Sequence, residues 1–259
     1  MSEERRAKSE EPALVSYLLR LGDDRLVLGH RNSEWCGHGP VLEEDIATAN
    51  IALDLLGQAT LFLHLAGQVE GEGRDEDALA YWRDETRFTN LQMLELPKGD
   101  FGFTILRQVL FDAWSYHHLQ ELTRSSHAEL AALAAKAHKE TRYHLRHSSE
   151  WVLRLGDGTD ESHRRMQAAL DELWPWTGEL AWQNDVDAEL RAKGIVPDLE
   201  VLRAPWEAMV RDILGRATLV VPNTPMRMTG GRLGRHTEHL GHMLAEMQIV
   251  ARSHPGAKW

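Results

Sequence analysis

The stretch from Ile51 to Ala66 limits what this chain can fold into more than any other. It lies within a segment, Leu42 to Val69, whose apolar residues recur at helical spacing and occur almost all the way round the helix. A helix of this kind is buried on more than one side, either as the central helix of its own chain or beneath a second subunit. Asn50, Asp54 and Gln58 form a narrow polar stripe along it, and buried polar groups need hydrogen-bond partners.

The rest of the chain also has helical spacing, with prolines and glycines between the periodic segments. No segment alternates apolar and polar residues between turn signals, as a surface strand would. The spacing predicts further helices over residues 13–30, 76–96 (as one or two), 103–125, 129–155, 163–193, 199–219 and 235–253. We therefore expect an all-α fold in a single domain, residues 13–259, with a four-helix bundle over about 13–155 and helical additions over about 163–259.

Net charge and cysteine content exclude several classes of function. The net charge of −11 argues against nucleic acid as a partner. Cys36 is the only cysteine, so neither an intrachain disulfide nor a zinc cage of thiolates can form. Residues 1–12 are charged and lack the apolar core of a signal peptide, and no apolar run reaches the roughly 20 residues that span a bilayer. We expect a cytoplasmic protein with a disordered tail over residues 1–12 and no membrane partner.

The sequence around His144 nearly matches the di-iron pattern of four-helix bundles. In such bundles two helices each carry Glu-x-x-His, since residues three apart share a helix face. The residue three before His144 is Thr141, and the nearest acid, Glu140, is four before it. Glu140 and His144 are therefore either remnant or active metal ligands, or an ordinary polar pair on a solvated helix face.

A second group of possible ligands runs from His236 to His242. His236, His239 and His242 recur every three residues, and histidines along one helix face can bind zinc or nickel. Three-residue spacing drifts around a helix, so the three are not expected to meet at one metal. The alternative is a solvated or interface face, on which the helix dipole favours Glu238 near the N-terminus.

Several motifs resemble one bacterial family in collinear order. They are Arg20-Leu21-Gly22-Asp23, Glu34-Trp35-Cys36-Gly37-His38, Leu53-Asp54-Leu55-Leu56-Gly57-Gln58-Ala59, Arg142-Tyr143-His144-Leu145-Arg146 and Gly234-Arg235-His236-Thr237-Glu238-His239-Leu240-Gly241. From about Tyr17 to Trp259 the chain is similar to the structural C subunit of the bacterial ring-1,2-phenylacetyl-CoA epoxidase, or phenylacetate-CoA oxygenase, in the ferritin-like family.

The resemblance implies a ferritin-like fold and a place in a cytoplasmic multicomponent monooxygenase of aerobic phenylacetate catabolism, a pathway of aromatic degradation. That enzyme turns phenylacetyl-CoA into a ring 1,2-epoxide with O2 and reducing equivalents from a separate reductase. In the family the A subunit carries the di-iron centre, and the C subunit is its non-catalytic relative and scaffold. For this chain the resemblance implies no cofactor of its own, the catalytic A subunit as partner, and a homodimer within a hetero-oligomer.

Because the two subunits share a fold, the iron-ligand positions of the catalytic relative can be placed on this sequence. Counting within each helix gives Arg25 on the first helix, Leu55 and Gln58 on the second, Asp112 on the third, and Thr141 and His144 on the fourth.

This set is poor in iron ligands. Hard iron sites need several anionic oxygens, and of the six positions only Asp112 supplies a carboxylate. Arg25 can replace cationic charge in the bundle centre and pair with Asp112 or Asp54, which is a structural role. The sequence therefore predicts no metal site and no catalytic residue in this chain.

The residues that contact a partner are a separate question. Interface candidates are Leu56 and Leu63 on the apolar helix, together with His236, Glu238 and His239. Two other interpretations stay open. One is an independent metal-binding ferritin-like protein that uses Glu140 and His144 or the segment from His236 to His242, and the other is an interaction module unconnected with oxygenation.

Overall fold

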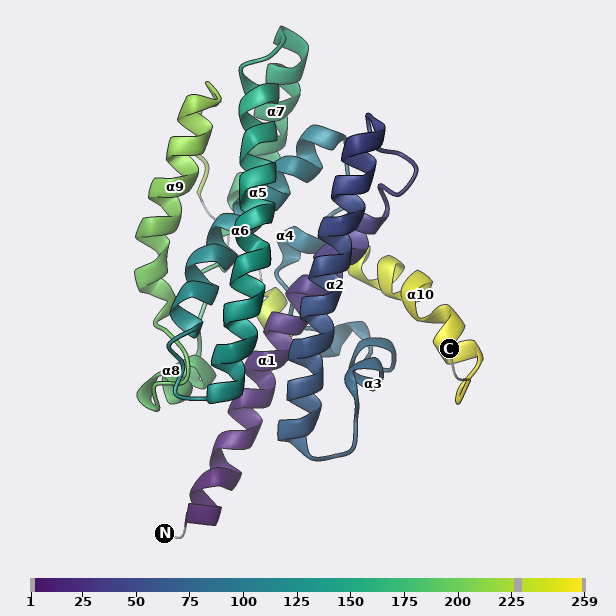
Figure 1. Cartoon of the computed structure of the whole chain (residues 1–259), viewed down its shortest axis with the longest axis vertical. Coiled ribbons are helices and arrows are strands. Elements are labelled where there is room, and N and C mark those ends of the chain that lie inside the picture. The colour runs from purple at the N-terminus through teal and green to yellow at the C-terminus, as the bar shows by residue number, and fades with distance from the viewer. Residues whose placement is uncertain (1–2, 226–229, 258–259) are drawn as a thin grey trace. The chain divides into compact units, whose positions relative to one another are not determined.

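The structure, a computed structural model, describes residues 3–225 and 230–257, and for residues 3–11 it describes the backbone alone. The described residues form helices and connecting turns, with no strand among them (Figure 1). The prediction of an all-α, ferritin-like helical fold with additional C-terminal helices is confirmed. The long helices are α1 (Glu3–Ser33), α2 (Leu42–Glu70), α5 (Phe101–Leu122) and α6 (Ala128–Gly156), and the shorter ones are α3 (Glu76–Tyr81), α4 (Gln92–Glu95), α7 (Asp160–Leu173), α8 (Asp185–Ala192), α9 (Arg203–Arg216) and α10 (Glu238–Ser253).

The chain forms two compact units, each made of segments that are distant in sequence. The first unit contains Met1–Arg31, Ala52–Pro97 and Gly230–Trp259, and the second contains Asn32–Ile51 and Lys98–Thr229. The boundaries between the units fall within α1 and α2. The organisation as a single domain over residues 13–259 stays a prediction, as does disorder over residues 1–12; α1 begins at Glu3 instead of near Ala13.

In the first unit, glycines on α1 allow α2 to approach closely. A Cβ atom at Gly22 would lie 2.7 Å from Cδ2 of Leu63, and one at Gly29 would lie 3.0 Å from Cγ of Leu56. Residue numbers rise along one helix as they fall along the other, so α1 and α2 are antiparallel. Leu63 is 1% exposed, so this contact belongs to the core of the first unit.

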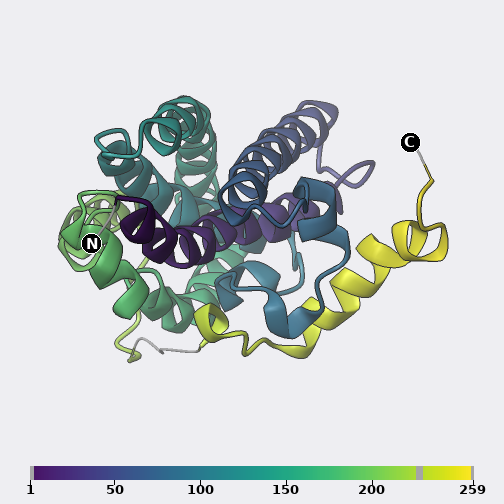
Figure 2. The same cartoon turned by 90° about the horizontal axis from the view of Figure 1, so that it is seen from below.

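The second unit is built around α5, which is buried along most of its length. Asp100 caps it by accepting a hydrogen bond from the backbone N–H of Phe103. The helices α6, α7 and α9 all pack against α5, as Figures 1 and 2 show. Trp206 on α9 donates from Nε1 to the carbonyl oxygen of Leu110, 3.1 Å away, which fixes α9 against α5.

One predicted helix is wrong. The spacing predicts a single helix over residues 163–193, but α7 ends at Leu173 and a 3-10 helix, Trp174–Glu179, separates it from α8. Pro175 accounts for the break because it has no N–H to donate and its ring clashes with the preceding helical turn. The cap predicted at Thr159 or Asp160 is confirmed at Thr159, whose side chain accepts from the N–H of Ser162.

α2 is less uniformly buried than the sequence predicts. Ile51, Leu55 and Phe62 are buried, but Leu53 is 66% exposed, and Asn50 of the expected polar stripe faces solvent. By length and composition, α2 is also the only helix of the described residues that could cross a membrane, with 44% of its apolar window buried. A core helix of a soluble protein has the same properties, so this feature alone does not place the protein in a membrane.

Candidate functional site

Two of the six degenerate ligand positions meet in the first unit. Arg25 on α1 and Gln58 on α2 are both buried, and the Nε of Arg25 donates to Oε1 of Gln58 over 2.8 Å. The guanidinium also donates from Nη1 to the carbonyl oxygen of Leu21 and lies 4.9 Å from the centre of the Phe62 ring. These contacts hold a positive charge at a position where the catalytic relative is expected to place a carboxylate. Pairing of Arg25 with Asp112 or Asp54 stays a prediction.

Leu55, the third degenerate position of the first unit, is 1% exposed and contributes only apolar atoms. It follows that the first unit offers a guanidinium, an amide and an isobutyl group at the three predicted positions. None of these is an anionic oxygen ligand of the kind that a hard iron site needs.

In the second unit, Asp112 on α5 is the buried carboxylate that the sequence predicts. Its Oδ1 accepts a hydrogen bond from Nε2 of Gln108 (2.7 Å), and its Oδ2 accepts one from Oγ of Ser148 (3.1 Å). Gln108 in turn accepts from Nδ2 of Asn32 over 2.7 Å. Asp112 is therefore part of a buried hydrogen-bond chain that joins α5 to α6, which is a structural role.

Thr141 and His144 lie on the buried face of α6, one turn before Ser148. Glu140 is half-buried and lies beside this face, as expected of a residue four positions before His144. Among residues 3–225 and 230–257, no group of three or more His, Cys, Asp and Glu side chains is arranged to hold a metal ion. At the six predicted positions, the donors suited to iron are one carboxylate and one imidazole, so these positions do not fit a di-iron centre.

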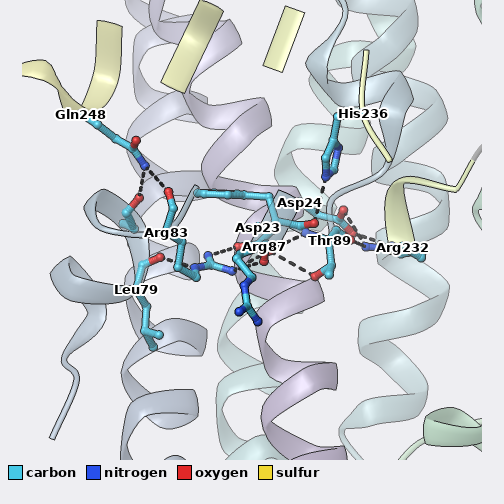
Figure 3. Close-up of polar contacts among 11 residues, drawn as sticks. Asp23, Asp24, Leu79, Arg83, Arg87, Thr89, Arg232, His236 and Gln248 are labelled. Atoms are coloured by element: carbon cyan, nitrogen blue, oxygen red, sulfur yellow. Dashed lines mark hydrogen bonds and ion pairs between the residues drawn. The ribbon is translucent and has the colours of Figure 1, made fainter. Parts of the chain in front are cut away.

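A different polar cluster fills the interior of the first unit (Figure 3). The carboxylate of Asp23 on α1 is fully buried and is paired with the guanidinium of Arg83. It also accepts hydrogen bonds from the backbone N–H (2.9 Å) and the hydroxyl (3.1 Å) of Thr89. The guanidinium of Arg83 lies over the ring of Phe88, 4.3 Å from its centre. The buried carboxylate thus replaces water with protein donors, which a buried charge requires.

The next residue on α1, Asp24, ties down the C-terminal segment. Arg232 donates to both of its carboxylate oxygens, from Nη1 over 2.9 Å and from Nη2 over 2.8 Å, and the backbone N–H of Leu91 donates to it as well. Burial raises the pKa of Asp24, and the charge and hydrogen bonds of Arg232 oppose that rise. Further along, Gln248 on α10 donates to the carbonyl oxygens of Ala80 and Arg83, each 3.0 Å away.

His236 is held in this cluster by contacts that suit its protonated form. Its Nε2 lies 2.9 Å from the carbonyl oxygen of Phe88, which only accepts, so Nε2 carries a proton. Its Nδ1 lies 3.4 Å from Oε2 of Glu95, whose side chain is fully buried. A second proton on Nδ1 completes that contact. Burial lowers the pKa of His236, but the hydrogen bond to Glu95 and its charge raise it, and the net pKa is above the ordinary 6.5.

We expect His236→Gln to remove one component of the pH dependence of stability. Because the folded-state pKa of His236 is raised, its protonation stabilises the fold fully below the unfolded pKa, and this contribution is lost as pH rises through the folded pKa. The difference in unfolding free energy between wild type and variant should therefore be larger at about pH 6 than at about pH 8 in urea titrations. An equal difference at both pH values would contradict the protonated state.

The remaining interface candidates differ in exposure. Leu63 is buried against Gly22, and Leu56 is half-buried against Gly29. Glu238 is exposed at the start of α10, and the carbonyl oxygen of His239 accepts from Arg31 over 3.2 Å. His236 lies before α10 begins, whereas His239 and His242 lie within it, so the three histidines do not share one helix face. Whether any of these residues contacts a partner stays a prediction.

Sequence reasoning missed most of the polar cluster in the first unit. The adjacent acids Asp23 and Asp24 on a predicted helix were a signal that could have found it, since both are buried. Arg83 and Arg232 carried no such signal, because each lies far along the chain from the aspartate it contacts. Ser148 was detectable as the residue four positions after His144 on the same helix face.

Comparison with known proteins fits this geometry. The chain matches the family of phenylacetic acid catabolic proteins over residues 1–259. It is 52% identical over 246 residues to the C subunit of 1,2-phenylacetyl-CoA epoxidase from Escherichia coli (strain K12), a match that covers 95% of this chain and 99% of that protein. The resemblance noted in the sequence is thereby confirmed, and the chain belongs to the phenylacetic acid catabolic protein family.

Proposed function

We propose that this chain is the non-catalytic structural subunit of a multicomponent di-iron monooxygenase that epoxidises phenylacetyl-CoA in aerobic phenylacetate catabolism. The observation that carries the proposal is the Arg25–Gln58 hydrogen bond. A buried guanidinium supplies positive charge without a metal, and it repels a metal cation placed near it. The relative from Escherichia coli, whose length this chain covers almost completely, is itself a subunit of such an epoxidase.

In this proposal the partner is the catalytic A subunit, and the di-iron centre belongs to that partner. The two chains would assemble in the cytoplasm as a hetero-oligomer that contains a homodimer of this chain. The exposed apolar side chains Ile46 and Leu53 on α2 support assembly, because a second chain would remove them from water. The buried hydrogen-bond chains in each unit would keep the scaffold rigid without metal ligands.

Co-expression with the catalytic subunit tests the proposal. The chain should copurify with that subunit as a complex of defined native mass, and the catalytic subunit should melt at a higher temperature in the complex than alone. This chain by itself should not consume phenylacetyl-CoA. Two chains that remain separate at micromolar concentration, or epoxidation by this chain alone, would contradict the proposal.

A further inference from the structure

A groove in the first unit lies between α3 and α10. It has a volume of about 550 Å³, and its walls come from residues 75–82 on one side and residues 247–257 on the other. Both walls belong to the first unit, where α10 packs against α3. Asp77 and Tyr81 also line a second hollow of about 150 Å³ on the other side of α3, so the groove continues past these two side chains.

The groove carries negative charge that its own surroundings do not neutralise. Asp75, Glu76 and Asp77 are consecutive. Asp75 caps α3 through the N–H of Ala78, and Glu76 bonds His64 over 2.8 Å. Asp77 has neither a hydrogen-bond nor an ion-pair partner within the part of the chain that the structure describes. Partial burial raises the pKa of Asp77, and the charges of Asp75 and Glu76 raise it further.

Aromatic and aliphatic side chains surround this carboxylate. Trp82 is 51% exposed, and Tyr81 lies close enough to Asp77 for its charge to raise the phenol's pKa, in addition to the effect of burial. The opposite wall includes Met247 and Val250 of α10, and Val250 is 53% exposed. A carboxylate beside an indole ring suits a cation, because both attract positive charge, while the aliphatic wall suits the alkyl part of the same guest.

We propose that this groove binds a lysine or arginine side chain presented by an apolar segment of another subunit of the epoxidase. The inference rests on the proposed function for the identity of the partner. Charge complementarity selects the cation, and the exposed apolar residues on both walls favour a protein segment over a small, fully hydrated cation. The partner's positive charge would lower the pKa of Asp77 on binding, so assembly would release protons from groups in this groove.

The test is the affinity of variants for the other epoxidase subunits of the same organism, each purified and titrated separately. Asp77→Lys should weaken binding of one subunit at least about tenfold, and Trp82→Ala, which keeps the charge, should weaken the same interaction several-fold. Asp77→Asn should have an intermediate effect and serves if the lysine variant fails to fold. Asp212→Lys is the matched control, because Asp212 is an exposed aspartate of the second unit and its loss should leave affinity within about twofold.

The outcomes separate this inference from the proposed function. Wild-type binding that persists unchanged in Asp77→Asn, Asp77→Lys and Trp82→Ala would overturn the groove and leave the scaffold function intact. Loss of affinity in Asp212→Lys equal to that in Asp77→Lys would also overturn it, since the effect would then follow net charge. If wild type binds no epoxidase subunit, both the inference and the proposed function fail.

Discussion

Arg83→Met is expected to lower the free energy of unfolding by about 3–5 kcal/mol. The substitution keeps much of the apolar stem that packs near Phe88 but removes the guanidinium that faces Asp23. The carboxylate of Asp23 is fully buried, and after the substitution the two donors of Thr89 would face it without any compensating positive charge from Arg83. Denaturant titration of wild type and variant, with the slopes compared, measures the change.

Two further variants locate the cause. The double variant Asp23→Leu, Arg83→Met should recover most of the loss, because it replaces the whole pair with apolar groups and leaves no uncompensated charge. Arg164→Met breaks an ion pair with Glu161 on the exposed surface of α7 and should cost less than about 1 kcal/mol. A cost of similar size for Arg83→Met and Arg164→Met would show that burial of the Asp23–Arg83 pair has no energetic consequence.

Leu63→Asp should be the most damaging single change on α2. Leu63 is 1% exposed and lies against Gly22 of α1, where a side chain has no room to turn toward water. An aspartate there must either bury an unpaired charge or separate the two helices, so we expect a loss of more than about 4 kcal/mol or failure to fold. Soluble yield and the cooperativity of thermal melting are the measurements.

Leu53→Asp provides the control on the same helix. Leu53 is 66% exposed, so the same substitution should change the unfolding free energy of the isolated chain by less than about 0.5 kcal/mol. Similar melting of the two variants would mean that α2 does not pack on α1 through Leu63. If Leu53→Asp melts normally but fails to assemble with the catalytic subunit, the exposed stripe of α2 lies in the interface.

The long helices could be predicted from sequence because their apolar periodicity and their end signals agree. The expected starts of α2, α5 and α6 fall within about two residues of those observed. The helix expected over residues 163–193 failed because its apolar spacing continues through Pro175, and periodicity does not register the loss of one backbone donor. The exposure of Leu53 could not be predicted because an all-round apolar helix gives no indication of which side its chain leaves uncovered.

At the candidate site, residue identities were predictable and their partners largely were not. The chemical unsuitability of Arg25, Leu55 and Gln58 for iron follows from their side chains alone. The bond from Arg25 to Gln58 depends on how α1 and α2 pair, which a single sequence does not specify. The same holds for His236, whose contacts with Phe88 and Glu95 depend on the path of the C-terminal segment.

The iron content of the assembled complex tests the central claim most directly. The complex of this chain with its catalytic partner would be reconstituted under iron-replete anaerobic conditions, and the chains would then be separated and each analysed for bound iron. We predict about two irons per catalytic chain and none that remains with this chain. About two irons per copy of this chain would contradict the account, because Arg25, Leu55 and Gln58 would then occupy positions that do not ligate iron and the true ligands would lie elsewhere.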